Sequence, residues 1–185
     1  ASDLKLTATV TDADGDSVTH DLNLGASIFS IEDDGPTITT GSVVAADTLT
    51  VDETTLSTDA TANFANNFTP AINYGADGAG STAYSLSLSS ASVASGLYAL
   101  GTGAGVQGTE ITMTQTGNTI TGSAGGTDYF TIAINTSTGV VTLNQLAAIY
   151  HANENDPDDS STLATAIASD LKLTATVTDA DGDSV

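Results

Sequence analysis

Three aspartates alternate with alanine and glycine in the sequence DADGD at residues 12–16, and the same five letters return at residues 179–183. Alternating acidic residues in a glycine-containing turn bring three carboxylates within reach of one point, and calcium takes about six to eight oxygen ligands. Without a cation, two carboxylates about 4 Å apart repel one another by roughly 1 kcal/mol in water. The spacing therefore predicts a Ca²⁺ site at each turn; the alternative is an Asp-rich hairpin turn that needs no metal. The candidate ligands are Asp12, Asp14 and Asp16 in the first copy and Asp179, Asp181 and Asp183 in the second.

The segments that must position these turns have a period of two. Residues 4–10 and 18–24 alternate apolar side chains with mostly polar ones, as strands with one buried face do. Because both flanks are strands, and Asn23 stands where the bidentate glutamate of an EF-hand belongs, the turn is not an EF-hand.

The rest of the chain continues this pattern. A two-residue hairpin loop is expected at Gly117-Asn118 and a second loop at 136–139, and only residues 146–151 favour a short helical turn. Many short strands with Gly, Asn and Asp turns predict an all-β fold, an antiparallel β-sandwich. Further strands are expected at 84–88, 111–113, 130–134 and 141–143.

Residues 1–18 recur letter for letter at residues 168–185, so the chain holds one repeat of 167 residues and the start of the next. This identity indicates a tandem array. The acidic Gly-Pro segment 32–36 is the expected linker, because Gly-Pro interrupts both sheet and helix. Residues 1–31 are then the closing β-hairpin of a preceding repeat, and residues 37–185 are a β-sandwich module truncated in its last hairpin. A repeat of this length allows either one elaborated sandwich or two small ones, and the hairpin can pack within the molecule, on another molecule, or loosely.

The composition is strongly acidic. The chain carries 23 Asp and Glu against two lysines, for a formal net charge of −21. Such a chain offers no basic face for nucleic acid or for an anionic membrane surface, and no stretch approaches the roughly 20 apolar residues of a membrane span. There is no cysteine and only 5% aromatic residues, so neither disulfides nor a large apolar core can hold the fold. Bound calcium is the expected source of additional stability.

Catalytic motifs are weak. The glycines of GxGxxG at 103–108 precede a strand-like segment rather than the helix that a dinucleotide site requires. No constellation of His, Cys and Ser stands out, so an enzyme is not expected. His151 adjoins an acidic stretch at 152–160, which is either a solvated loop or a further ion site.

The order of motifs along the repeat resembles the extender repeats of large repeats-in-toxin (RTX) biofilm adhesins of Gram-negative bacteria. The motifs are VDET at 51–54, YGADG at 74–78, TGVVTLNQ at 138–145, AIYH at 148–151, then TATVTDADGDS and finally EDDGP. The glycine-rich nonapeptides that name the wider family are missing, so a calcium β-roll is not expected here.

The resemblance implies β-sandwich modules of immunoglobulin or cadherin character, strung end to end, exported by type I secretion to the cell surface and stiffened by calcium at their junctions. The function that it implies is structural extension of an adhesin whose distal ligand the sequence does not indicate, with neighbouring repeats of the same chain as partners. The alternative is a module that binds carbohydrate or another surface through avidity, although the scarcity of aromatic side chains disfavours it. Carried onto this chain, the junction ligands are the turn aspartates Asp12, Asp14 and Asp16 together with Glu32, Asp33, Asp34, Asp52 and Glu53.

Overall fold

The computed structural model describes residues 1–185 except 1–3, 26–27, 40–46, 154 and 157. The chain divides into two compact units, Ala1–Asp34 and Gly35–Val185, and the division falls inside the acidic Gly-Pro segment. No helix in these described ranges is long and apolar enough to cross a membrane.

The first unit is a single antiparallel hairpin. Strands β1 (Lys5–Thr11) and β2 (Ser17–Asn23) pair along their whole length, from Lys5 opposite Asn23 to Thr11 opposite Ser17. Every residue of both strands is exposed, including the apolar residues that the alternating pattern placed on one face. The hairpin therefore has no core of its own.

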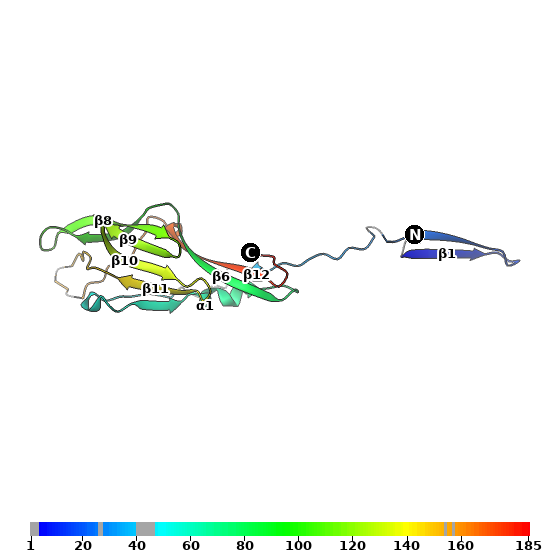
Figure 1. The fold of residues 1–185 in the computed structure, drawn as a ribbon, viewed down its shortest axis with the longest axis horizontal. Helices are drawn as coiled ribbons and strands as arrows, with labels where there is room; N and C mark the ends of the chain where they lie inside the picture. The colour runs from blue at the N-terminus through cyan, green and yellow to red at the C-terminus, as the bar shows by residue number, and fades with distance from the viewer. Residues whose placement is uncertain (1–3, 26–27, 40–46, 154, 157) are drawn as a thin grey trace. The chain divides into compact units, whose positions relative to one another are not determined.

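The second unit is one antiparallel sandwich, whose layers are a six-stranded sheet and a two-stranded sheet; β3 and β5 form a further short antiparallel pair. The larger sheet has the order β4-β11-β10-β9-β8-β7, and the smaller one pairs β12 with β6. In Figure 1, β12 (red) runs alongside β6 (green), although these strands lie far apart in the sequence. The strands are β3 (Thr37–Ile38), β4 (Ala60–Asn63), β5 (Ile72–Asn73), β6 (Ala79–Leu88), β7 (Val93–Leu100), β8 (Gln107–Thr116), β9 (Thr119–Ala124), β10 (Thr127–Ile134), β11 (Val140–Gln145) and β12 (Leu171–Asp179).

A shared core joins the two sheets. Ile111, Met113 and Ile120 of the larger sheet are fully buried, and Tyr84 of β6 and Ala175 of β12 belong to the same cluster. In β8 and β12 the exposed positions next to the buried ones carry Thr, so the period-two pattern of the sequence follows the two faces of these strands. The predicted all-β antiparallel sandwich is confirmed.

The local turn predictions are confirmed in two places. Gly117-Asn118 joins β8 to β9 with Thr116 opposite Thr119, and Gly117 has the positive φ (58°) that favours glycine. The loop before Gly139 joins β10 to β11, and Asn135 Oδ1 accepts hydrogen bonds from two of its backbone N–H groups.

The helical turn expected at 146–151 is wrong. That segment is irregular, and Ile149 forms an isolated bridge with Ala99 of β7. Leu146 N and Ala147 N both donate to Tyr129 O, at 2.7 and 3.3 Å, so these N–H groups are tied to the sheet rather than to a helical turn. The described helical elements lie elsewhere, at α1 (Ala65–Phe68), η1 (Glu53–Thr55), η2 (Thr69–Ala71) and η3 (Ala168–Asp170).

Candidate metal-binding turns

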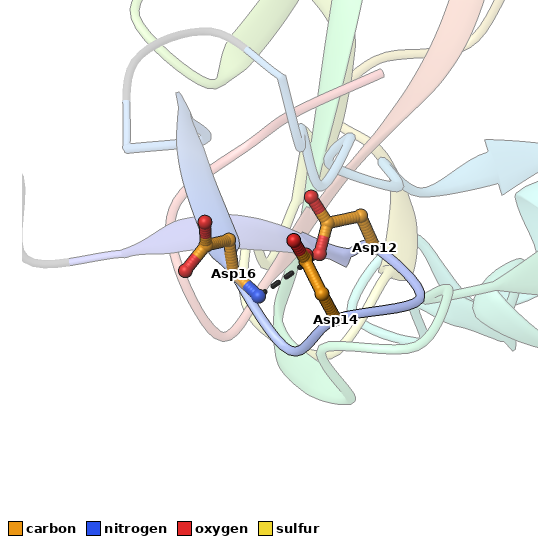
Figure 2. Close-up of side chains that lie close together, drawn as sticks. All are labelled: Asp12, Asp14 and Asp16. Carbon is orange, nitrogen blue, oxygen red and sulfur yellow. Dashed lines mark hydrogen bonds between the residues drawn. The ribbon is translucent and has the colours of Figure 1, made fainter.

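The first acidic turn joins β1 to β2. Asp12 N donates to Asp16 O at 2.9 Å, and Asp12 Oδ1 accepts from Gly15 N at 3.1 Å and from Asp16 N at 2.9 Å. Gly15 has a φ of 103°, a conformation that side-chain-bearing residues rarely adopt. Figure 2 shows the carboxyl groups of Asp12 and Asp14 lying next to one another, with the Asp16 N–H directed at Asp12.

The three carboxylates of this turn converge. Asp12, Asp14 and Asp16 each offer an oxygen within 4.8 Å of the other two, and all three residues are exposed. The hydrogen-bonding interaction with the Asp14 side chain, together with backbone N–H groups of the turn, holds the pKa of Asp12 below its usual value of 3.8. The group is therefore an anionic cluster of hard oxygen ligands on the surface of the hairpin.

The second copy of the sequence builds the same turn after β12. Asp179 N donates to Asp183 O at 3.0 Å, and Asp179 Oδ1 accepts from Gly182 N and Asp183 N at 3.0 and 2.8 Å. Gly182 has a φ of 112°, close to that of Gly15. Asp179, Asp181 and Asp183 again bring three carboxylate oxygens within 4.8 Å of one another. The shared residues around the turn thus specify its geometry locally in both copies.

The surroundings of the two turns differ. Asp12 is exposed, whereas Asp179 has only 3% of its surface exposed. A β-bulge between Thr178 and Asp179 sets Asp179 opposite Ala79 at the start of β6, and a side chain on Gly80 would collide with the Asp179 carbonyl. Glycine at position 80 therefore lets β6 approach the backbone of Thr178 and Asp179 closely.

One oxygen of this buried carboxylate is left over. Asp179 Oδ1 accepts the two backbone hydrogen bonds, but Oδ2 is buried and has no hydrogen-bond partner among the described residues. An unpaired buried carboxylate oxygen is costly, and a cation held between it and the neighbouring carboxylates satisfies it. This orphaned oxygen is an observation, independent of the number of acidic residues, that fits a bound metal ion.

The protonation of Asp179 reflects opposing effects. Burial acts to raise the pKa of its carboxyl group, while interaction with the Asp181 side chain and the N–H groups of Gly182 and Asp183 lowers it. The net result is a pKa below the usual value of 3.8. Asp179 is therefore a carboxylate near neutral pH, which is the form that a cation requires.

Asp77 is a further acidic neighbour that the sequence reasoning missed. Its carboxylate has an oxygen within 4.8 Å of one on Asp181. Ala180 N donates to Gly78 O at 3.1 Å, which fixes the 74–78 loop beside the second turn. A signal was present in the sequence, because the letters Ala-Asp-Gly occur at 76–78 as they do within both acidic turns. The fourth carboxylate increases the negative charge at the second turn.

The other predicted ligands lie outside the two DADGD segments. Glu32, Asp33 and Asp34 are exposed residues of an irregular segment between β2 and β3. Asp52 precedes η1, and its Oδ1 accepts from Thr54 N at 2.8 Å, which lowers the pKa of its carboxyl group.

Glu53 is engaged within the larger unit. Its Oε1 accepts hydrogen bonds from Gln145 Nε2 and Ile149 N, both at 2.8 Å, and lies 3.3 Å from His151 Nε2. Glu53 therefore ties η1 to the chain that follows β11, and it is not a member of either three-carboxylate turn.

Comparison with known proteins gives one match. Residues 48–185 match the family described as a domain of unknown function, DUF5801. No curated protein and no solved structure matches the chain significantly. The matched region covers most of the larger unit, including the buried acidic turn and Asp77, so the chain belongs to the DUF5801 family.

Proposed function

We propose that this chain is a calcium-stabilised extender module, one of a series of tandem repeats that projects the distal ligand-binding region of an adhesin from the surface of a Gram-negative bacterium. The observation that carries the calcium part of this proposal is the buried Oδ2 of Asp179, which has no hydrogen-bond partner among the described residues and stands in a cluster of carboxylates. Hard oxygen ligands without nitrogen or sulfur favour Ca²⁺ over transition metals.

Repetition and charge support the extender part. An identical segment at both ends of a 167-residue period adds length with each copy, and the net charge of −21 makes copies repel one another unless cations neutralise them. Calcium that binds the folded unit stabilises it by mass action, by about 1.4 kcal/mol when its concentration is ten times the dissociation constant. Extracellular calcium modules have dissociation constants of about 10⁻⁴ to 10⁻³ M, so occupancy is expected outside the cell.

The test compares the same substitution at two equivalent residues, Asp179 in the second acidic turn and Asp12 in the first. Asp179→Asn keeps an oxygen that can accept from Gly182 N and Asp183 N but removes the charge, and Asp12→Asn makes the same change in the exposed copy. We expect Asp179→Asn to weaken Ca²⁺ binding to the larger unit by about tenfold or more, equivalent to about 1.4 kcal/mol. Asp12→Asn should leave that binding event unchanged.

Isothermal titration with CaCl₂ and thermal unfolding with and without chelator provide the measurements. In the unsubstituted chain, calcium should raise the melting temperature of the larger unit, and Asp179→Asn should remove most of that rise. Equal calcium affinity in both variants, or a melting temperature that chelation leaves unchanged, contradicts a calcium site at the buried turn.

The carbohydrate-binding alternative has one structural feature in its favour. A cavity of about 270 Å³ is lined in part by Tyr98, Tyr150, Gln107 and Ser161, which combine aromatic surface with hydrogen-bonding groups. A glycan array probed with the chain tests this alternative. Binding that Tyr150→Ala abolishes would make the module a ligand-binding adhesin rather than an extender.

A further inference from the structure

Three side chains form one row across the edge of the larger sheet. Tyr98 of β7 lies opposite Glu110 of β8 in the strand pairing. On the other side of β7, Ala99 forms an antiparallel bridge with Ile149, and the residue after Ile149 therefore lies opposite Tyr98. That residue is Tyr150, whose N–H donates to Tyr98 O at 2.8 Å. Because directly opposite residues of antiparallel strands point to the same face, about 4.5–5.5 Å apart, the row brings two aromatic rings and a carboxylate together.

This row borders the cavity of about 270 Å³ described above. Tyr98 and Tyr150 both line the cavity, and each is half-buried. Glu110 Oε1 accepts a hydrogen bond from Gly96 N at 3.3 Å, and Gly96 belongs to the cavity wall, so the carboxylate is held at the border of the cavity. The remaining lining residues are uncharged: Leu97, Gln107, Ala152, Ser161 and Thr162.

The charges near this cavity are negative or balanced. The described lining includes neither of the chain's two lysines: Lys5 belongs to the first unit, and Lys172 lies opposite Ser87 in the smaller sheet. The nearby His151 has its Nε2 3.3 Å from Glu53 Oε1, so a positive charge on its ring is balanced by that carboxylate. The net charge of −21 adds a long-range field that attracts cations. The described lining therefore offers an anion no positively charged side chain, whereas a cation meets two aromatic rings beside a carboxylate.

We propose that this cavity binds a small organic cation through a quaternary ammonium group, which lies against the rings of Tyr98 and Tyr150 while Glu110 supplies the counter-charge. The face of an aromatic ring attracts a cation, and quaternary ammonium ligands are recognised in this way. A primary ammonium is more strongly hydrated and loses more of its hydration on entering a cavity that has a single carboxylate at its border. A neutral sugar, the other candidate for this cavity, gains nothing from the charge of Glu110. The site is separate from the acidic turns and does not depend on the calcium proposal.

The first test compares two ligands of one shape on the unsubstituted full chain. Choline chloride is titrated against the tert-butyl analogue of choline, in which carbon replaces the charged nitrogen, and methyl glucoside is the neutral sugar. Nuclear magnetic resonance at fixed calcium and ionic strength follows the signals of Tyr98 and Tyr150. We expect choline to shift both signals, and we expect the neutral analogue to bind roughly tenfold more weakly or less tightly still.

Matched variants separate the two parts of the site. Tyr150→Leu removes the ring but keeps an apolar side chain, and Tyr150→Phe keeps the ring. Glu110→Gln removes the charge but keeps an oxygen that accepts from Gly96 N. Asp128→Asn is the charge control, because it changes the net charge equally on β10, where Asp128 Oδ1 accepts from Ser123 Oγ. Tyr150→Leu should weaken choline binding roughly tenfold and Glu110→Gln roughly threefold, while Tyr150→Phe and Asp128→Asn should leave it unchanged.

Each measurement has an outcome that overturns the proposal. The site is not a cation site if choline shifts neither tyrosine signal, if the neutral analogue binds as tightly as choline, or if methyl glucoside binds more tightly. Equal losses in Asp128→Asn and Glu110→Gln would show attraction by overall charge alone. The ligand comparison uses the unsubstituted chain, so it stands even where a variant fails to fold.

A further arm distinguishes the source of the quaternary ammonium group. Co-sedimentation of the chain with phosphatidylcholine vesicles, reversed by excess choline, identifies a lipid headgroup as the ligand. Binding of free choline without co-sedimentation identifies a soluble cation. Both results support the site, and co-sedimentation that excess choline leaves unchanged contradicts headgroup binding at the two tyrosines.

Discussion

Lys5 supplies the positive charge nearest to Asp21 on the β1–β2 hairpin. Lys5 Nζ lies 2.6 Å from Asp21 Oδ2, and Thr7 Oγ1 donates to Asp21 Oδ1 at 2.5 Å. The Lys5 interaction first, and then the Thr7 hydroxyl, lower the pKa of the Asp21 carboxyl group. Side chains on one face of the hairpin thus link β1 to β2.

The charge pair predicts a pH dependence of the hairpin. Because the pKa of Asp21 is lower in the folded hairpin than in the unfolded chain, the pair stabilises the hairpin above the unfolded value, about 3.9, and this contribution is lost as pH falls through the folded pKa. Lys5→Met should raise the pKa of Asp21 toward the unfolded value, measured by NMR titration of its carboxyl carbon. Lys172→Met is the control, because Lys172 is paired with Ser87, and an equal shift in both variants would exclude the Lys5 contact as the cause.

The acidic turns show which parts of the candidate site were predictable at this scale. The convergence of Asp179, Asp181 and Asp183 follows from local turn chemistry, and the sequence predicted it. The burial of Asp179 and the neighbouring Asp77 could not be predicted, because they depend on a β-bulge and on β6, about 100 positions earlier in the chain.

At the scale of elements, the packing between β9 and β10 depends on a glycine of β9 that contacts an aromatic ring of β10. Gly122 lies opposite Phe130, and a Cβ on Gly122 would overlap the Phe130 ring. Phe130 is 4% exposed, so its ring lies in the core and has little room to move.

This contact predicts the effect of a single methyl group. Gly122→Ala should lower the free energy of unfolding of the larger unit by about 1–3 kcal/mol, because the Phe130 ring must leave its packed position. Chemical denaturation monitored by circular dichroism measures this loss. Gly35→Ala is the control, since a Cβ there meets only Asp183 Oδ2 and Cβ at ordinary contact distances of 3.8 and 3.9 Å. A Gly122→Ala chain as stable as the control would mean that Phe130 has more freedom than the structure shows.

The elements that the sequence predicted are those with local causes. The Gly117-Asn118 turn and the alternating strands depend on residues adjacent in the chain. The helical turn predicted at 146–151 is wrong because backbone N–H groups of this segment donate to residues elsewhere in the fold instead of to a helical turn. Ile149 N donates to Glu53, which also accepts from Gln145 Nε2, and Leu146 N donates to Tyr129 O. Tertiary hydrogen bonds outweighed a weak local propensity.

At the scale of the whole molecule, the division into two units falls within the acidic Gly-Pro segment. The single break in compactness falls between Asp34 and Gly35, next to three consecutive acidic residues, Glu32, Asp33 and Asp34. The repeat length left one or two sandwiches open, and the structure has one, because β4 and β7–β11 form a single sheet over a core shared with β6 and β12.

The extender proposal predicts a calcium effect on length. In a protein with three or more tandem copies, chelation of calcium should reduce the maximum dimension measured by small-angle X-ray scattering. Without bound calcium, the junctions between copies should bend freely. The comparison is made at matched ionic strength near 0.15 M, where screening over about 8 Å limits general charge repulsion. Magnesium chloride at the same concentration is the control for non-specific neutralisation. An unchanged scattering profile, or equal effects of magnesium and calcium, contradicts stiffening by calcium.

The 18 shared residues also bear on how the number of copies changes between related proteins. Recombination at any point within this stretch joins two copies in frame, and it adds or deletes whole 167-residue periods. The strand delivered to β6 has the same residues on either side of such a crossover, so no pairing across the smaller sheet is altered. If the proposed tandem array exists, its genes can therefore lengthen or shorten without any compensating substitution in the fold, and natural variants are expected to differ by integral numbers of periods.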